Sequence, residues 1–354
     1  MRKSTAFFHR PFLIRLFNWE YWSFNTVYLL IYPVWIYLCI RARSFFFFAA
    51  SNPSIQNGGF LNESKEDIYA IMPEELYPKT VFFKLPINKE HVLNLLRTEG
   101  LEFPLIGKPD SGGRGRGVKT LIDEEAVRDY VQNAIMNFHI QEYVSYKNEV
   151  GIFYHRYPGE ATGRISGIVR KKFLSVTGDG QHSIRDLLAQ DKRGIMYLDA
   201  MDRIHGAVLD TVLPPGEEKI VSPYGNHARG SLFLDDTHLA DTQLNASIDR
   251  ICKQVKDFYY GRLDIRFNSW EELRNGKALS IIEVNGAGSE PTHIYDPRHG
   301  LFFAWKEIIR HWFILYRISV QNHKKGYPYL SLKDGIAMFR ENKAHSKKLA
   351  EMPE

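Results

Sequence analysis

The chain has 354 residues, of which 44% are hydrophobic and 25% are charged. That composition belongs to an ordinary folded protein and excludes a disordered chain, a collagen-like repeat and a coiled coil. The formal net charge of +5 suits an anionic small ligand and does not favour nucleic acid as a partner. The two cysteines, Cys39 and Cys252, are too few for a disulfide framework or a thiolate zinc site, and they fit a reducing, cytoplasmic compartment.

The N-terminal residues 1–50 are more aromatic and apolar than the rest. Residues 21–40 carry no charge and are followed by Arg41 and Arg43. A helix of that length would be ~30 Å long, close to the thickness of a bilayer core. Pro33 interrupts the segment, however, and both flanks are basic, so they indicate no orientation. Three alternatives stay open: a helix docked on the cytoplasmic membrane surface, a helix packed on the protein's own core or a second subunit, and a membrane span.

The rest of the chain alternates irregularly between helical and extended patterns, which predicts an α+β fold with antiparallel pairs rather than a doubly wound sheet. Residues 51–80 read as a loop rich in turn signals, and residues 323–354 as a polar, basic tail. The other expected elements are a helix over 89–99 capped by Asn88, a strand over 103–108, a helix over 124–137 capped by Asp123, strands over 140–144, 150–157 and 164–176, a helix over 184–190 capped by Ser183, a helix over 242–258, strands over 261–268 and 278–285 joined through the Asn275-Gly276 turn, and a buried helix over 301–320.

A glycine-rich loop follows the strand that carries Lys108. Four glycines within six residues allow close approach of the backbone to a ligand, and their N–H groups are able to surround an anion. The loop is neither a Walker motif nor a dinucleotide fingerprint, and a flexible surface turn is the alternative. Its residues are Ser111, Gly112, Gly113, Arg114, Gly115, Arg116 and Gly117.

Two late strands present a set of oxygen ligands. Because side chains alternate along a strand, Asp264 shares a face with Arg262, and Glu283 shares a face with Asn285. Antiparallel pairing would bring the two carboxylates and the amide together. Oxygen ligands without His or Cys suit a hard cation, Mg²⁺ before Mn²⁺. Arg262 beside them is placed to stabilise a transferring phosphate or an oxyanion, and a solvated, charge-paired strand face is the alternative.

Four short motifs, in this order, resemble those of the ATP-grasp ligases over residues 79–296. The first resembles the family's lysine strand and the start of its flap, the second its adenine hinge and ribose carboxylate, and the last two its metal-binding strands. They are Phe103 to Asp110, Gln141 to Val144 with Glu149, Gly261 to Asp264, and Ile282 to Asn285. The last two resemble D-alanine–D-alanine ligases, whereas residues 176–188 and 226–230 resemble cyanophycin synthetase.

The resemblance implies two α+β subdomains that clamp ATP, and an ADP-forming ligation of a carboxylate to an amine through an acyl phosphate. Lys108 and Arg262 would take part in catalysis. Nucleotide contacts would come from Lys79, Lys108, Ser111, Gly112, Gly113, Gly115, Gly117, Gln141, Glu142, Tyr143, Val144 and Glu149. Asp264, Glu283 and Asn285 would hold Mg²⁺ or Mn²⁺, and Arg170, Asn226, Arg229, Ser289 and His293 would contact substrate.

The chain departs from the family at its start, where relatives keep an α/β domain that helps bind the first substrate. Either the loop 52–65, with Gly58 and Lys65, binds substrate here, or a lipid-borne or protein-borne substrate arrives otherwise. Expected partners are a small-molecule or peptide carboxylate and an amine, with membrane contact and oligomer formation open. A phosphotransferase without ligation and a nucleotide-binding module without turnover are the alternative functions. The expected organisation is an N-terminal segment over 1–50, a linker over 51–100, an ATP-grasp domain over 101–322 with an insertion near 177–222, and the tail over 323–354.

Overall fold

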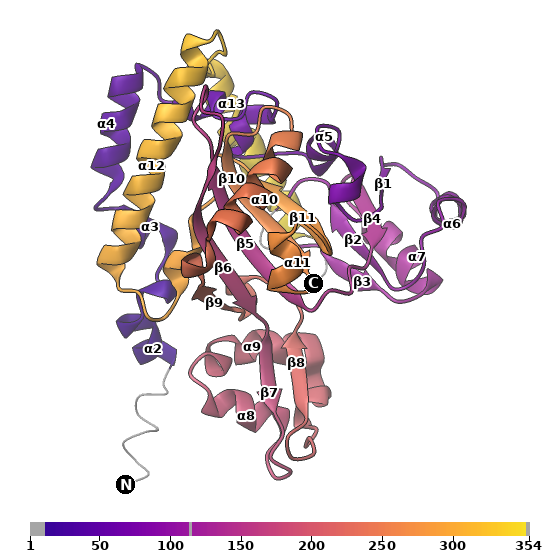
Figure 1. The fold of residues 1–354 in the computed structure, drawn as a ribbon. Helices are drawn as coiled ribbons and strands as arrows, with labels where there is room; N and C mark the ends of the chain where they lie inside the picture. Colours follow the sequence, from indigo (N-terminus) through magenta and orange to yellow (C-terminus); the bar gives the residue numbers. More distant parts are fainter. Residues whose placement is uncertain (1–10, 113–114, 352–354) are drawn as a thin grey trace. The chain divides into compact units, whose positions relative to one another are not determined.

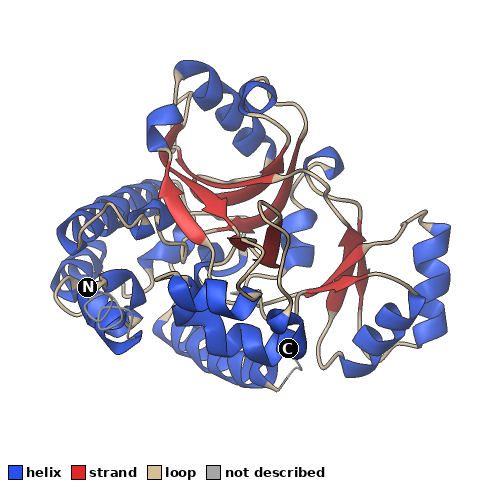
Figure 2. Cartoon of the chain, turned by 90° about the horizontal axis from the view of Figure 1, so that it is seen from below, coloured by secondary structure: helices blue, strands red, loops and turns tan. Residues whose placement is uncertain are grey.

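The computed structural model describes residues 11–112 and 115–351 (Figure 1). Gly113 and Arg114 of the glycine-rich loop therefore lie outside the described residues. The chain divides into two compact units, each assembled from separate stretches of sequence. Unit 1 consists of Met1–Tyr32, Val169–Asp235 and Thr292–Glu307, and unit 2 of Pro33–Ile168, Asp236–Pro291 and Ile308–Glu354. The expected α+β class with antiparallel sheets is confirmed, as the strands and helices of Figure 2 show.

The smaller sheet of unit 2 carries the predicted lysine strand. Its strands are β1 (Thr80–Phe83), β4 (Phe138–Glu142), β2 (Leu105–Pro109) and β3 (Lys119–Leu121), antiparallel in that order. Two amphipathic helices, α6 (Lys89–Thr98) and α7 (Glu124–Asn133), pack on it through buried side chains such as Val92 and Val127. The predicted N-caps are confirmed, because Asn88 accepts from the N–H of Glu90 and Asp123 from that of Ala126.

The larger sheet runs in the order β11 (Leu279–Asn285), β10 (Tyr260–Phe267), β5 (Asn148–His155), β6 (Arg164–Lys172) and β9 (Leu232–Asp235). The predicted alternation holds on β10, where Leu263 and Ile265 are buried against α10 (Thr242–Gln254). Ile248 of α10 belongs to the same core, and burial of a side chain of this size contributes ~1.5–3 kcal/mol. The sequence predicted that a turn at Asn275-Gly276 joins β10 to β11. The connection also contains a short helix, α11 (Trp270–Arg274), which was not predicted.

The segment expected as a loop over 51–80 contains regular structure that packs on β11. It forms η3 (Gln56–Gly59), α5 (Lys65–Tyr69) and η4 (Glu74–Leu76). The N–H groups of Ala287 and Gly288 donate to the carbonyls of Gly58 and Gly59 at 3.0 and 2.8 Å. Gly59 has φ +73°, and a Cβ there would lie 2.6 Å from Cα of Gly286. This close backbone contact holds the segment beside the end of β11.

The aromatic N-terminus is a series of short helices. In unit 1 these are α2 (Pro11–Phe17), η1 (Trp19–Tyr21) and α3 (Phe24–Tyr28), and α4 (Tyr32–Ala42) passes into unit 2. Trp35 of α4 packs edge-on against Trp312 of α12 (Leu301–Lys324), with ring centroids 5.2 Å apart. Leu38 joins them in a core that includes η2 (Phe47–Ala50). Among the described residues, none of the helices combines the length and the apolar character needed to cross a membrane.

In unit 1, the strand expected over 164–176 is divided. β6 ends at Lys172, and β7 (Leu174–Thr177) pairs instead with β8 (Glu218–Ser222). Two helices, α8 (Ile184–Gln190) and α9 (Gly194–His205), pack on this pair, followed by η5 (Gly206–Asp210). Ser183 caps α8 as predicted and forms a reciprocal capping box with Asp186. The remaining short turns are η6 (His227–Arg229) and η8 (Thr292–Tyr295) in unit 1, and η7 (Thr237–Leu239) in unit 2.

The C-terminal residues expected as a polar tail form a helix, α13 (Leu332–Ala350), whose first turn is capped by Ser331 and which buries Met338. A mostly polar helix with few apolar residues has a weak periodic pattern, so composition alone suggested a tail. The helix expected to be buried, α12, does bury Ala304, Ile308 and Ile318, whereas Phe302 in its first turn is 83% exposed.

Candidate active site

The predicted oxygen ligands lie on one strand pair, in two residue pairs separated by the pair Leu263–Val284. In the β10–β11 register Asp264 stands opposite Glu283, and Arg262 stands opposite Asn285. Asp264 is buried, whereas Glu283 and Asn285 are partly exposed. The strand pairing has a bulge between Asp264 and Ile265, where the register shifts by one residue. Asp264 and Glu283 are the last directly opposed pair before that shift. Like charges directly opposite each other are destabilising unless a cation lies beside them.

Arg262 supplies one such cation. Its Nε and Nη2 donate to the two carboxylate oxygens of Asp264 at 2.8 and 3.1 Å, a bidentate pair. Asn285, on the opposite strand, has a buried Nδ2 without a hydrogen-bond partner in the described part of the chain. On this polar face Asp264 is therefore paired with Arg262, and Asn285, which stands opposite Arg262, carries an unsatisfied amide. An unsatisfied buried donor of this kind is costly, and a ligand that accepts from it would relieve the cost.

Lys108 projects from β2 toward β11. Its Nζ donates to the hydroxyl of Tyr69 at 2.6 Å and lies 3.4 Å from the carbonyl of Ile282, next to Glu283. The side chain is 5% exposed. Burial lowers the pKa of Lys108 to about 8, although the carboxylate of Glu283 acts in the opposite direction. The site thus holds a desolvated ammonium that a phosphate would stabilise.

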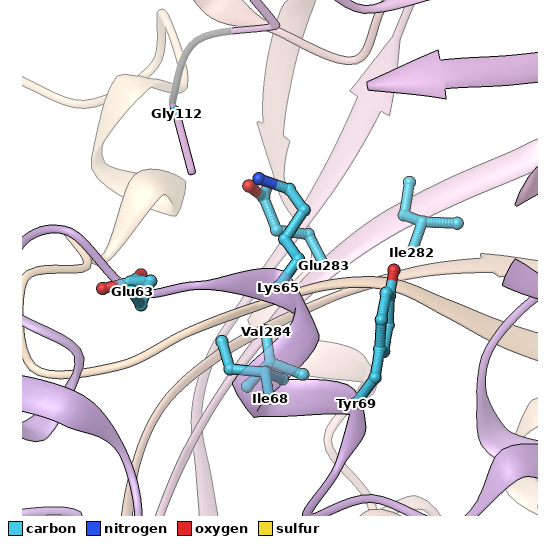
Figure 3. Close-up of a pocket in the computed structure, with 8 residues that line it drawn as sticks. All are labelled: Glu63, Lys65, Ile68, Tyr69, Gly112, Ile282, Glu283 and Val284. Atoms are coloured by element: carbon cyan, nitrogen blue, oxygen red, sulfur yellow. The ribbon is translucent and has the colours of Figure 1, made fainter. Parts of the chain in front are cut away.

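A small pocket lies between β11, the helix α5 with Glu63 just before it, and Gly112 of the glycine-rich loop (Figure 3). In that view the side chains of Lys65 and Glu283 extend together toward Gly112. Burial, together with repulsion by Glu283, raises the pKa of Glu63 to about 7. The pocket is lined by Glu63, Lys65, Ile68, Tyr69, Gly112, Ile282, Glu283 and Val284.

The start of the glycine-rich loop is held by Asp110. One oxygen of Asp110, Oδ1, accepts from the hydroxyl of Ser64 and the N–H of Glu66, and it lies 3.0 Å from Nε2 of His139. Burial raises the pKa of Asp110, but these hydrogen bonds outweigh it and lower the pKa overall. Lys65 contributes two more bonds, from its N–H and its Nζ to the carbonyl of Asp110. The network joins α5 to the first residue of the loop.

The loop itself needs glycine at Gly115 and Gly117, which have φ of +70° and +69°. The carbonyl of Gly117 accepts from the hydroxyl of Tyr130, which fixes the far end of the loop on α7. At the near end, α13 lies against the loop. Nε2 of His345 is 2.9 Å from the carbonyl of Ser111, and a Cβ on Gly112 would meet Leu349 at 3.2 Å.

The predicted adenine hinge lies at the end of β4. Gln141 is buried and its Oε1 has no hydrogen-bond partner among the described residues, whereas Glu142 and Tyr143 are exposed and Val144 is intermediate. The N–H of Glu142 donates to the carbonyl of Lys79 at 2.9 Å. Lys79 is itself about half exposed and its ammonium pairs with Glu99, outside the pocket described above.

The other predicted ligands are in contact with protein groups. Glu149 of β5 forms a 3.1 Å ion pair with Arg266, and the hydroxyl of Ser289 donates to the carbonyl of Gly286 at 2.6 Å. In unit 1, Asn226 caps η6, Arg229 lies over the ring of Tyr224, and buried His293 lies 3.4 Å from Glu307. Arg170 is an exposed residue of β6, also in unit 1.

Sequence reasoning gave no individual role to three residues of the pocket, Glu63, Ile68 and Tyr69, although Glu63 lies in the loop 52–65 that was one alternative for binding substrate. None of the three belongs to a motif, and the contact of Gly58 and Gly59 with the turn after β11 holds their segment beside the site. The pair Gly58-Gly59 was the available signal, because successive glycines mark close backbone approach. The residues that they contact, Ala287 and Gly288, lie 229 positions further along the chain, and local pattern does not reveal such a partner.

No protein-family model matches the sequence, and no curated protein matches it. Among solved structures, a D-alanine–D-alanine ligase from Bacillus anthracis is 14% identical with a TM-score of 0.42, covering 74% of this chain and 69% of that one. A bifunctional glutathione synthetase from Pasteurella multocida is 15% identical with a TM-score of 0.37, and the match covers 74% of this chain but 38% of that one. The VanG D-Ala:D-Ser ligase from Enterococcus faecalis is 14% identical with a TM-score of 0.36, covering 68% and 57%. Resemblance at this level identifies neither a substrate nor a site residue.

Proposed function

We propose that the chain is a cytoplasmic ATP-grasp enzyme that ligates an amino-acid or peptide carboxylate to an amine, with ADP and phosphate as products. The observation that carries the proposal is the convergence of Lys108 with Glu283, the carboxylate opposite Asp264, beside a pocket that also reaches Gly112 of the glycine-rich loop. A cation from one sheet, carboxylates from another and a glycine-rich loop are the components that phosphoryl transfer requires.

The nucleotide would lie between these groups. Lys108 is a compact charge for an α- or β-phosphate, and the desolvation that lowers its pKa strengthens that interaction. The glycine-rich loop would cover the phosphates and exclude water from a labile acyl phosphate. At the hinge, the buried Oε1 of Gln141 offers an unsatisfied acceptor for an exocyclic amino group such as that of adenine.

The donor set fits a hard divalent cation. Asp264 and Glu283 offer opposed carboxylates and Asn285, two residues from Glu283 on the same strand, offers an amide oxygen; a cation would offset the repulsion between the carboxylates. Asp264 would have to share its oxygens with Arg262. A bound Mg²⁺ would supply charge neutralisation at the phosphates. Within the described residues there is no group of three His, Cys, Asp or Glu side chains suited to a metal, so the amide of Asn285 would be needed as the third protein ligand.

The reaction has two steps. A carboxylate oxygen of the first substrate forms a bond to the γ-phosphorus of ATP, and the bond between that phosphorus and the β–γ bridging oxygen breaks to release ADP. The amine then attacks the acyl carbon, phosphate leaves with the C–O electron pair, and the amine nitrogen loses a proton. Arg262 would stabilise the tetrahedral oxyanion between attack and departure. We place the first substrate against Glu63 and Lys65, which line the pocket where relatives keep a separate domain.

A panel assay tests the proposal. The protein is mixed with ATP, Mg²⁺ and a set of amino acids and dipeptides, and the products are analysed by phosphate release and mass spectrometry. The ligase proposal requires phosphate together with a new amide. A phosphorylated product without an amide would instead identify a phosphotransferase, and saturable ATP binding without any product would identify a non-catalytic nucleotide-binding module.

A further inference from the structure

The helix α4 has an apolar face that the rest of unit 2 leaves uncovered. Ile36 and Ile40 are 52% and 70% exposed, and Tyr37 beside them is 47% exposed. Their spacing of three and four residues places them on one side of the helix. Phe45, just beyond the helix, is also largely exposed. In Figure 1 α4 lies on the outer side of α12.

The opposite face of the same helix is firmly packed. Leu38 and Cys39 are buried, and Trp35 contacts Phe47 and Trp312 at centroid distances of 5.0 and 5.2 Å. The helix is therefore held in place by its inner face, and the apolar outer face is not needed for the fold. An apolar face of this kind marks a surface where something else binds.

The charged side chains of the segment that carries this face are all of one sign. Residues 21–62 contain no Asp, Glu or Lys, and the charged side chains in that stretch are Arg41 and Arg43. Both are exposed at the C-terminal end of α4, and Arg41 donates to the hydroxyl of Tyr37 at 3.0 Å. Arginine beside apolar and tyrosine side chains suits the boundary between acyl chains and phosphate groups.

We propose that the outer face of α4 docks on an anionic phospholipid surface. Ile36 and Ile40 enter the acyl boundary, Tyr37 lies at the level of the headgroups, and Arg41 and Arg43 bind lipid phosphates. A second copy of the chain fits this face less well. An isologous contact would bring the arginines of both copies toward a segment, 21–62, that has no acidic residue, whereas a bilayer supplies the negative charge.

The test uses the full chain and co-sedimentation with vesicles. Vesicles of phosphatidylcholine mixed equally with phosphatidylglycerol should bind the protein, vesicles of phosphatidylcholine alone should bind it weakly, and added salt should reduce the binding. The double variant Ile36→Ser/Ile40→Ser should lose at least ~10-fold in affinity for the mixed vesicles. Arg41→Gln/Arg43→Asn should lose the dependence on phosphatidylglycerol, and Asn is chosen because Arg43 has φ +55°.

The matched control is Ile122→Ser, which changes another exposed isoleucine of unit 2, 68% exposed, away from α4. It should bind vesicles as the unchanged protein does. Because all these side chains are exposed, each variant should unfold at the same urea concentration as the wild-type protein. Absence of vesicle binding, or equal loss in the control, would overturn the proposal. So would a dimer in sedimentation equilibrium that Ile36→Ser/Ile40→Ser dissociates, since a second copy would then occupy the face. None of these measurements depends on ATP turnover.

Discussion

Replacing Lys108 by Met should stabilise the fold while it weakens nucleotide binding. The fall in the pKa of Lys108 from its ordinary 10.5 to about 8 measures the cost of keeping its charge in the folded protein. That cost is about 3 kcal/mol at pH 7, where the lysine is charged in both the folded and the unfolded chain. Met fills a similar volume without a charge, but it loses the hydrogen bond to Tyr69, a loss of about 1 kcal/mol. The free energy of unfolding should therefore rise by about 2 kcal/mol.

The same reasoning predicts a pH dependence of known sign. Above pH ~8 folded Lys108 loses its proton, while the unfolded chain keeps one until pH ~10.5, so the unfolded state binds more protons and the wild-type protein gains stability with rising pH. The advantage of Lys108→Met should accordingly shrink by about 2 kcal/mol between pH 7 and about pH 9.5. Nucleotide affinity of the wild-type protein should fall over the same range, as the cation is lost.

Urea denaturation at both pH values measures the stability, and ATP titration measures the affinity. Lys84→Met is the matched control, because Lys84 is an exposed lysine of the same unit, directly after β1. It should change neither quantity. A Lys108→Met protein that is less stable than wild type at pH 7, with an unchanged pH profile, would refute the argument from desolvation. An unaltered ATP affinity would refute the phosphate role.

Three further changes test separate parts of the structure. Glu283→Ala should lower Mg²⁺-dependent ATP turnover by at least ~100-fold with little effect on the urea midpoint; full turnover would remove the metal assignment. Gly59→Ala should unfold or displace the segment before α5, because its Cβ would lie 2.6 Å from Cα of Gly286 at φ +73°; an unchanged urea midpoint and unchanged ATP affinity would contradict that close contact. Ile248→Ala should lower the free energy of unfolding by ~2–5 kcal/mol, since the side chain is fully buried under the larger sheet; a loss below 1 kcal/mol would show that this core repacks.

Local chemistry explains which elements were predictable. Asn88, Asp123 and Ser183 mark helix starts because each side chain bonds to N–H groups two or three residues away, and all three caps are present. The pairing of Asp264 with Glu283 followed from alternation along two apolar strands.

Elements stabilised by distant contacts were missed. The short α5 is held by bonds from its N-cap and first turn to Asp110, and α9 shares a core with β7, which precedes it in sequence, and β8, which follows it. For the same reason Glu63 could not be placed in the site: its neighbour Glu283 is brought to it by folding and not by sequence spacing. The periodicity of apolar residues indicates which face of a helix or strand is buried, but not which other element packs against that face.

The contact of α13 with the glycine-rich loop joins the C-terminal helix to the site of the proposed nucleotide contacts. Nε2 of His345 lies 2.9 Å from the carbonyl of Ser111, and Leu349 lies beside Gly112, the residues through which the loop leaves β2. If the loop moves when a ligand binds, the last turns of α13 must move with it or separate from it. We therefore expect the ATP affinity of protein with an affinity tag after Glu354 to differ from that of untagged protein.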